Sequence, residues 1–342
     1  MKRSLVGMSV ALLSIAPFGV WAQCQVVELE APAAWVPKGL SLSPKGLVSG
    51  SLDSQDGQFS RPAVWAADGR LKTLLPHDPA FQVTVVQASN DRGVHVGWRK
   101  VFGLSQPQAV RWEQGSLIAL QEGSPKSVNR HGVAVGHIDL SDGTSDKAVR
   151  WDATGAVSDL RIGRNNRSSN ADHINRHGQM FGWVSDQFFR SQAVRWSPDG
   201  KPKPLPSLGG KGRDGFAFAG NDRGDAVGFS ETTELFRRAT MWPGDSPENP
   251  IELGTLGGHM VPKAVNNKRV VVGDASLTTL ESTAFVWAGG AMRDLNTMVP
   301  PSFLQQGNQL IAAHSVIDDG TILVTAAKAW SSRGVLLTQC LE

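Results

Sequence analysis

Residues 171–205 read ADHINRHGQMFGWVSDQFFRSQAVRWSPDGKPKPL and contain one complete copy of a structural repeat. Valine, isoleucine, phenylalanine and tryptophan suit the pleated and partly buried surface of a sheet. Asparagine and glycine suit a tight turn, because we expect both to adopt the left-handed backbone conformation there. The segment therefore predicts strands over 171–175, 179–184 and 192–196, a tight turn at 175–178, and a last short piece that ends at Leu205.

The same pattern recurs along the 342-residue chain with a period near 45 residues. A four-stranded sheet of this length cannot bury both faces alone, so the copies must pack against one another. Four strands per copy favour a radial arrangement over a linear solenoid. Seven copies then predict an all-β, seven-bladed β-propeller of four-stranded antiparallel blades. The repeat is marked by Trp65, Trp112, Trp151, Trp196, Trp242 and Trp287, with a weaker last copy around 334–337.

The two ends of the chain complement each other. The last copy lacks its outer strand, and residues 26–29 resemble the missing one. We expect the N-terminal strand to close the last blade. Counting along the repeat places Cys24 and Cys340 at neighbouring positions of one hairpin turn, which predicts a disulfide between them. In the loop-entropy account such a bond contributes roughly 4–5 kcal/mol.

Residues 1–22 have the pattern of a secretory signal peptide: Lys2 and Arg3, an apolar core, and a small-residue cleavage site at Ala22. We expect the rest, residues 23–342, to form a single β-propeller domain exported to the periplasm or the extracellular space, where a disulfide persists. No later segment has the ~20 apolar residues that a spanning helix needs, so we expect no membrane span. Cleavage leaves 32 basic and 31 acidic residues. This balance argues against nucleic-acid binding, which calls for a basic face.

The turns of I-N-x-x-G type, the strand Ala284-Phe285-Val286-Trp287 and the LGTLGG segment at 253–258 resemble the HAF family of extracellular repeats. The resemblance covers about residues 35–340 and is strongest over 85–295. It implies secretion and a repeat structure, and it implies no assigned activity and no catalytic residues. The chain departs from the family pattern where histidine would precede the alanine and the aromatic residue: those places hold Gln108, Lys147, Gln192, Arg238 and Thr283.

Local catalytic motifs are missing. The sequence has no G-x-S-x-G, H-E-x-x-H, S-x-x-K or P-loop pattern. His131 and His177 occupy the same turn in adjacent copies and would lie too far apart for one metal ion. Asp139, Asp142 and Asp146 lack the EF-hand spacing, so we interpret them as a solvated hairpin loop. We therefore expect no catalytic residues, no metal site and no cofactor, although a hydrolase or lyase with its site at the central channel stays an alternative.

Three arginines, Arg111, Arg150 and Arg195, precede recurring tryptophans. They would either line an anionic channel or make contacts between blades, stacked on a ring or paired with a carboxylate such as Asp159. Recurrence at equivalent positions favours the contact between blades. We likewise expect the recurring tryptophans to form the core between blades.

Loops of variable length are predicted on the face of the ring opposite the tight turns, and loops on a rigid scaffold often carry function. Aromatic and arginine side chains on them are typical of protein-binding hot spots. We therefore predict a non-enzymatic monomer that binds a protein partner, or alternatively a glycan stacked on exposed Trp98 and Trp183. The candidate partner-binding residues are Trp98, Phe102, Arg164, Arg167, Phe188, Phe189, Arg190, Arg213, Phe236 and Arg237.

Overall fold

The computed structural model describes residues 23–101, 106–140, 146–276, 281–329 and 331–341. These residues form twenty-eight β-strands, one 3-10 turn, η1 (Leu295–Thr297), and one short α-helix, α1 (Pro301–Gln305). The all-β prediction is therefore confirmed. No helix in this part of the chain is long and apolar enough to cross a membrane. The predicted signal peptide, residues 1–22, lies outside the described residues.

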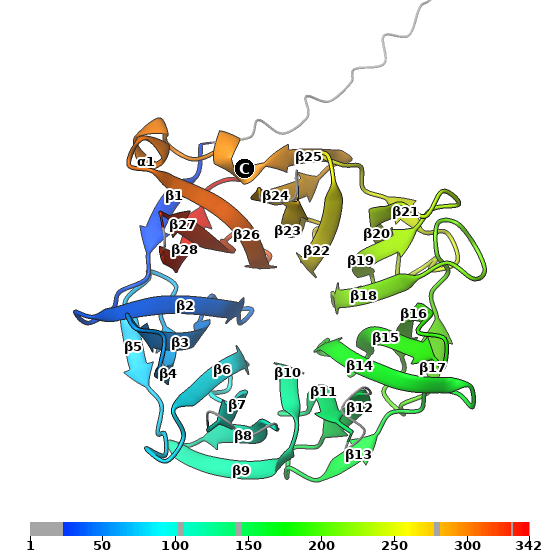
Figure 1. The fold of residues 1–342 in the computed structure, drawn as a ribbon, viewed down its shortest axis with the longest axis horizontal. Helices are drawn as coiled ribbons and strands as arrows, with labels where there is room; N and C mark the ends of the chain where they lie inside the picture. Colours follow the sequence, from blue (N-terminus) through cyan, green and yellow to red (C-terminus); the bar gives the residue numbers. More distant parts are fainter. Residues whose placement is uncertain (1–22, 102–105, 141–145, 277–280, 330, 342) are drawn as a thin grey trace, which may run out of the picture.

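Most strands pair in antiparallel groups of four, which we call blades, and the blades surround a central opening with their first strands innermost (Figure 1). Two blades join into one eight-stranded sheet through a single parallel pair, Ser60 with Val83. These two blades comprise β2 (Trp35–Leu42), β3 (Val48–Ser54), β4 (Ser60–Trp65) and β5 (Leu71–Leu74), and β6 (Val83–Ser89), β7 (His95–Lys100), β8 (Gln108–Glu113) and β9 (Ser116–Glu122).

The next four blades each follow the order of the chain. The first two comprise β10 (Ser124–Val128), β11 (Ala134–Asp139), β12 (Asp146–Trp151) and β13 (Val157–Asp159), and β14 (Asn166–Ile174), β15 (Met180–Asp186), β16 (Ser191–Trp196) and β17 (Pro202–Pro204). The other two comprise β18 (Gly215–Gly220), β19 (Ala226–Glu231), β20 (Arg237–Trp242) and β21 (Ile251–Glu252), and β22 (His259–Val265), β23 (Val271–Ser276), β24 (Ser282–Ala288) and β25 (Ala291–Asp294).

The last sheet unites the two ends of the chain. Its order is β1 (Gln25–Glu28), β28 (Ser331–Thr338), β27 (Ile322–Lys328) and β26 (Asn308–Val316). The β1–β28 pair is antiparallel and aligns Val26 with Leu337, the register that the repeat predicted. The buried Cys24 and Cys340 form the predicted disulfide. Arg333 on β28 also donates two hydrogen bonds of 2.6 Å to the carboxylate of Glu28.

The recurring tryptophans fill the spaces between blades, and five of the six are no more than 1% exposed. Trp287 is the exception, because its ring is only partly buried against its cluster. Three indole N–H groups donate to a carbonyl two residues past the last strand of the preceding blade, at 2.6–2.7 Å: Trp112 to Pro76, Trp196 to Arg161, and Trp242 to Pro206.

Trp65 makes the equivalent bond to the carbonyl of Glu30 at 2.7 Å. Glu30 lies two residues past β1, as Pro76 lies two residues past β5. The N-terminal strand therefore stands, relative to Trp65, where a fourth strand stands in the other blades.

The Asn-x-x-Gly turns form as predicted at the glycine and for a different reason at the asparagine. The glycines take the left-handed conformation, as at Gly178 and Gly224 with φ of 80° and 83°, but the asparagines do not. Instead Asn221 accepts hydrogen bonds from the N–H groups of Arg223 and Asp225, both at 3.0 Å. Its Nδ2 donates to the carbonyl of Asn266 in the next blade at 2.9 Å. The asparagine thus closes its own turn and bonds to the neighbouring blade.

The arginines before the tryptophans make contacts between blades, as predicted, through backbone carbonyls, and Arg111 also pairs with the carboxylate of Glu113 on its own strand at 2.9 Å. Asp159, the carboxylate expected to pair with them, lies instead 2.8 Å from Lys147. The contacts are Arg111 to Gly132 at 2.7 Å, Arg150 to Pro198 at 2.8 Å, and Arg195 to Gly224 at 3.0 Å.

Candidate functional site

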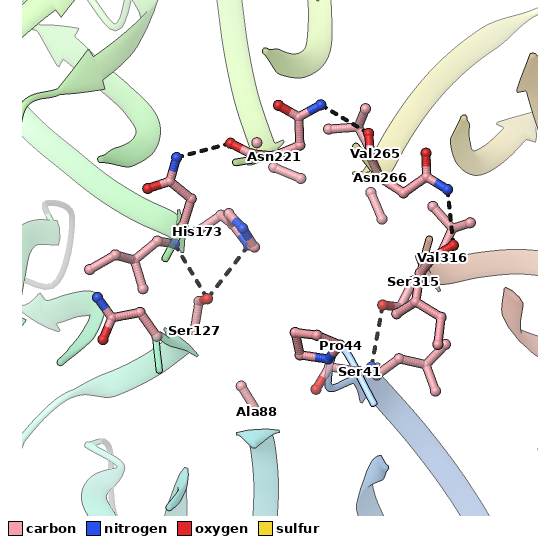
Figure 2. A pocket seen from close by; sticks show the side chains of 18 of the residues that line it. Ser41, Pro44, Ala88, Ser127, His173, Asn221, Val265, Asn266, Ser315 and Val316 are labelled. Carbon is pink, nitrogen blue, oxygen red and sulfur yellow. Dashed lines mark hydrogen bonds between the residues drawn. The ribbon is translucent and has the colours of Figure 1, made fainter. Parts of the chain in front are cut away.

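A cavity of about 740 Å³ occupies the centre of the ring at the end where the Asn-x-x-Gly turns lie. Its wall is built from the last residues of the innermost strands and from the turns that follow them (Figure 2). Small-molecule sites commonly enclose roughly 300–1,000 Å³. The size of the channel therefore suits a small ligand.

One layer of this wall comes from the residue three places before the turn in each copy. It is mixed in character and holds two lysines, one aspartate and one histidine. Lys263 forms an ion pair with Asp274, and the imidazole Nε2 of His314 lies 2.7 Å from the Thr325 hydroxyl. Burial lowers the pKa of His314 to about 4. The layer consists of Leu40, Gln87, Lys126, Asp172, Phe218, Lys263 and His314.

A polar network extends from the channel between the β10–β13 and β14–β17 blades. The Asn170 Nδ2 donates to Asp172 Oδ1 at 3.0 Å, and the Asn170 Oδ1 lies 3.2 Å from His137 Nδ1. The other ring nitrogen, Nε2, lies 3.3 Å from Asp139 Oδ1. We call the set Lys126, His137, Asp139, Asp146, Asn170 and Asp172 the channel-side cluster.

Burial shifts the pKa of three side chains in this cluster. It raises the pKa of Asp172 to about 7, against the opposing effect of the Lys126 ammonium. It also lowers the pKa of His137 and raises that of Asp146. The Asp172 Oδ2 is buried and has no hydrogen-bond partner within the described residues. Perturbed groups gathered beside a cavity are typical of functional sites.

A second candidate site lies on two hairpins of adjacent blades, β15–β16 and β19–β20. Their turns expose Phe188 (67%), Phe189 (74%), Leu235 (60%) and Phe236 (55%). Phe189 and Leu235 both take the left-handed conformation, with φ of 62° and 66°. The sequence predicted residues 235–238 on this face but only the three phenylalanines, and not Leu235, as binding residues. Leu235 occupies the same place in its turn as Phe189.

Asp214 joins the two hairpins. Its carboxylate accepts a hydrogen bond from the N–H of Ser191 at 2.9 Å, at the start of β16, and its carbonyl accepts one from the N–H of Glu231 at 2.8 Å, at the end of β19. Arg213, one residue earlier, donates to the carbonyl of Thr233 at 3.0 Å. The two exposed turns are thus held together through the 206–214 loop.

Arginines lie against the aromatic rings of these turns. The guanidinium of Arg190 lies 5.3 Å from the ring centre of Phe188, and that of Arg238 lies 5.1 Å from Phe236. Arg237 lies 5.1 Å from the ring of Phe229. We call the combined surface the aromatic–arginine face; it comprises Phe188, Phe189, Arg190, Arg213, Leu235, Phe236 and Arg237.

The remaining predicted residues lie elsewhere. Arg164 is exposed in the loop before β14, and Arg167 is exposed near the start of β14; both adjoin the face, because Asn166 pairs with Asp186. Trp98 belongs to β7, in a blade away from the face (Figure 1). Phe102 lies outside the described residues.

The two tryptophans expected to be open stacking platforms for a glycan do not fit that expectation. Trp98 and Trp183 are only partly exposed. The ring of Trp183 packs at 5.4 Å against Phe216, which belongs to the next blade. Inter-blade packing therefore uses part of the ring surface that a sugar would need.

No protein-family model and no curated protein matches the sequence. In structure, the chain is similar to a prolyl endopeptidase (TM-score 0.59, 8% identity), with 89% of this chain and 50% of that chain covered. It is also similar to TolB from Acinetobacter baumannii (TM-score 0.50, 12% identity), with 74% and 63% covered. A streptogramin B lyase overlaps at a TM-score of 0.48 and 11% identity, over 92% and 97%.

The chain thus spans about half of the endopeptidase and less than two thirds of TolB. At these identities the similarities show the fold alone, which is that of a β-propeller.

Proposed function

We propose that this protein is an exported, non-enzymatic β-propeller that binds a protein partner at the aromatic–arginine face. The observation that supports it is the exposure of four large apolar side chains on two turns that are hydrogen-bonded to each other through Asp214. Clustered exposed apolar residues mark interaction sites on soluble proteins. Aromatic and arginine side chains are the residue types that dominate such interfaces.

The charge around the face indicates the chemistry of the partner. The segments 161–167, 186–191, 206–214 and 231–238 carry eight basic residues against four acidic ones. The mature chain as a whole is expected to be almost neutral, so this excess is local. Complementary charge guides association and fixes orientation. We therefore infer a partner segment that combines carboxylates with apolar side chains.

We propose a closed ring of seven blades, a single monomeric domain, and membership of the HAF family. The equivalence of the Trp65–Glu30 bond with the other tryptophan bonds supports closure by the N-terminal strand. The disulfide supports export, because such bonds persist in oxidising compartments. The signal-like pattern of residues 1–22 supports it as well.

Selection of random peptides displayed on phage against the purified protein tests the proposed function. We expect the selected peptides to be rich in aspartate or glutamate beside apolar residues. Their binding should be lost with the double variant Phe188→Ala/Phe236→Ala and should weaken with Arg164→Glu. Phe59→Ala is the matched control, because Phe59 is 48% exposed on the β3–β4 hairpin of another blade. Selection of neutral or basic peptides, or equal binding by the double variant, would refute the proposal.

A hydrolase or lyase is the second candidate, and the channel-side cluster is the observation in its favour. Asp172 combines a pKa of about 7 with a place in the wall of a 740 Å³ cavity. A carboxyl group with such a pKa can give or take a proton near neutral pH. Turnover of a model ester, lactone or glycoside that disappears in Asp172→Asn would establish this function in place of the first. Equal rates of turnover in the wild type and in Asp172→Asn would exclude Asp172 as the catalytic group.

A further inference from the structure

Three side chains of the channel-side cluster have the arrangement of a metal-binding set. His137 and Asp139 alternate along β11 and so project from the same face of the strand. Asp146 on β12 lies directly opposite Asp139 in the antiparallel pair. One ligand atom from each of the three residues lies within 4.8 Å of the other two.

The neighbouring blade orients the imidazole. Asn170 on β14 is buried and donates its Nδ2 to Asp172, so its oxygen faces His137 Nδ1 at 3.2 Å. The proton on this imidazole therefore belongs on Nδ1. The Nε2 lone pair then faces the Asp139 carboxylate at 3.3 Å. Two electron-rich atoms at this distance repel each other unless a proton or a cation lies between them.

The formal charges of the cluster point to a divalent cation. As ligands, Asp139 and Asp146 would carry two negative charges, and the Lys126 ammonium lies within electrostatic reach of Asp146 and Asp172. With a neutral imidazole, two negative charges remain. One divalent cation would balance this charge.

We propose that His137, Asp139 and Asp146 bind one divalent transition-metal ion and that Asn170 is a positioning residue for His137. One imidazole and two carboxylates form a donor set that suits zinc or manganese. Three protein ligands leave a position open for water or a ligand. Hydrogen bonding of the second imidazole nitrogen to an outer partner is the usual support of a histidine ligand.

The sequence did not reveal this set. It drew attention to Asp139, Asp142 and Asp146 as a calcium-like spacing, and Asp142 lies outside the described residues. The missing signal is the i, i+2 relation of His137 to Asp139, which places both on one face of a strand. The contribution of Asn170 comes from another blade, 33 residues away from His137.

Isothermal titration of the tag-free, disulfide-intact protein with ZnCl₂ and MnCl₂ tests the proposal. We expect one Zn²⁺ per chain, bound more tightly than Mn²⁺ as the general affinity order requires. Asn170→Ala should weaken Zn²⁺ binding by about 10–100-fold, the usual effect of losing an outer partner. His137→Gln and Asp146→Asn should weaken it further. The cysteines form the disulfide, so thiolates would not contribute to the signal.

His131→Gln is the matched control, because His131 is an exposed turn residue of the same blade. It should leave Zn²⁺ affinity unchanged. Zn²⁺ should also raise the Tm of the wild-type protein and not that of His137→Gln, since only bound ligand stabilises the fold; this readout also shows whether each variant is folded. Failure to find saturable one-site binding would overturn the proposal. The proposal would also be overturned if folded His137→Gln bound Zn²⁺ as tightly as the wild type, or if His131→Gln lost as much Zn²⁺ affinity as His137→Gln.

Discussion

At the scale of the residue, Asn221 shows how one side chain stabilises two blades. Its Oδ1 accepts two backbone hydrogen bonds within its own turn, and its Nδ2 donates to the next blade. The sequence identified the asparagine but attributed it to backbone conformation. The true reason depends on a carbonyl 45 residues away, which no single copy of the repeat contains. Local turn chemistry was therefore predictable, and the partner of the amide was not.

We expect Asn221→Ala to lower the free energy of unfolding by about 1–3 kcal/mol, because buried hydrogen-bond partners are left unsatisfied. Urea unfolding monitored by tryptophan fluorescence measures this loss. Asn249 is exposed, so Asn249→Ala should change stability by no more than about 0.5 kcal/mol. Equal losses in the two variants would show that the inter-blade bond is not responsible.

The lowered pKa of His314 leads us to expect that the stability of the fold depends on pH. Burial lowers its pKa in the folded protein to about 4, below the ordinary value of 6.5. The unfolded chain therefore binds more protons between these values, and stability is lost as pH falls through this range. We expect His314→Gln to lose less stability than the wild type between pH 7 and pH 4.5. His177 is exposed in a turn, so His177→Gln should lose as much stability as the wild type when urea unfolding is compared across this pH range. If His314→Gln also lost as much stability as the wild type, His314 would not be the group responsible.

At the scale of the element, the strands and turns were predictable because alternation and turn residues are local signals. The variable hairpins were also predicted to carry the exposed phenylalanines, and they do. Leu235 was not among the predicted binding residues, because its exposure depends on a turn in which it takes a positive φ. The role of Asp214 was not predicted, because it lies in joining two hairpins. Burial and bridging are set by neighbouring blades, which the local pattern does not encode.

The left-handed conformation of Leu235 predicts opposite effects on stability and binding. A non-glycine residue there costs roughly 1–2 kcal/mol, part of which glycine would recover. We expect Leu235→Gly to raise the free energy of unfolding by about 0.5–1 kcal/mol while it weakens binding of the selected peptide. Gln114→Gly, at a positive φ of 51° in the β8–β9 turn, should stabilise without affecting binding. Chemical unfolding measures the effect on stability, and peptide titration measures the effect on binding. Loss of peptide binding in Gln114→Gly would contradict the placement of the binding site at the turn of Leu235.

At the scale of the whole molecule, the sequence predicted the pairing of the two ends because the last copy lacks a strand and the cysteines stand at matching positions. The β1–β28 register and the disulfide agree with that prediction. The channel-side cluster could not be predicted, because it unites side chains of different strands and blades. Its members have no common spacing in the sequence.

Removal of the disulfide tests the stabilisation of the joined ends. We expect Cys24→Ser/Cys340→Ser to lower the free energy of unfolding by about 2–5 kcal/mol, because the bond restricts an unfolded chain over a separation of 316 residues. Guanidinium unfolding of the wild type with and without reductant gives an independent measure of the same loss. Two freely reactive thiols in the oxidised wild type, or an unchanged stability, would contradict this account.

We propose that the aromatic–arginine face binds an acidic and apolar protein segment. Titration of a peptide selected on the wild type into Phe188→Ala/Phe236→Ala and Phe59→Ala tests it most directly. The account predicts that the double variant loses about 2 kcal/mol or more of binding free energy, as interface hot spots do, while Phe59→Ala binds like the wild type. Equal affinity of all three proteins for the peptide would contradict it.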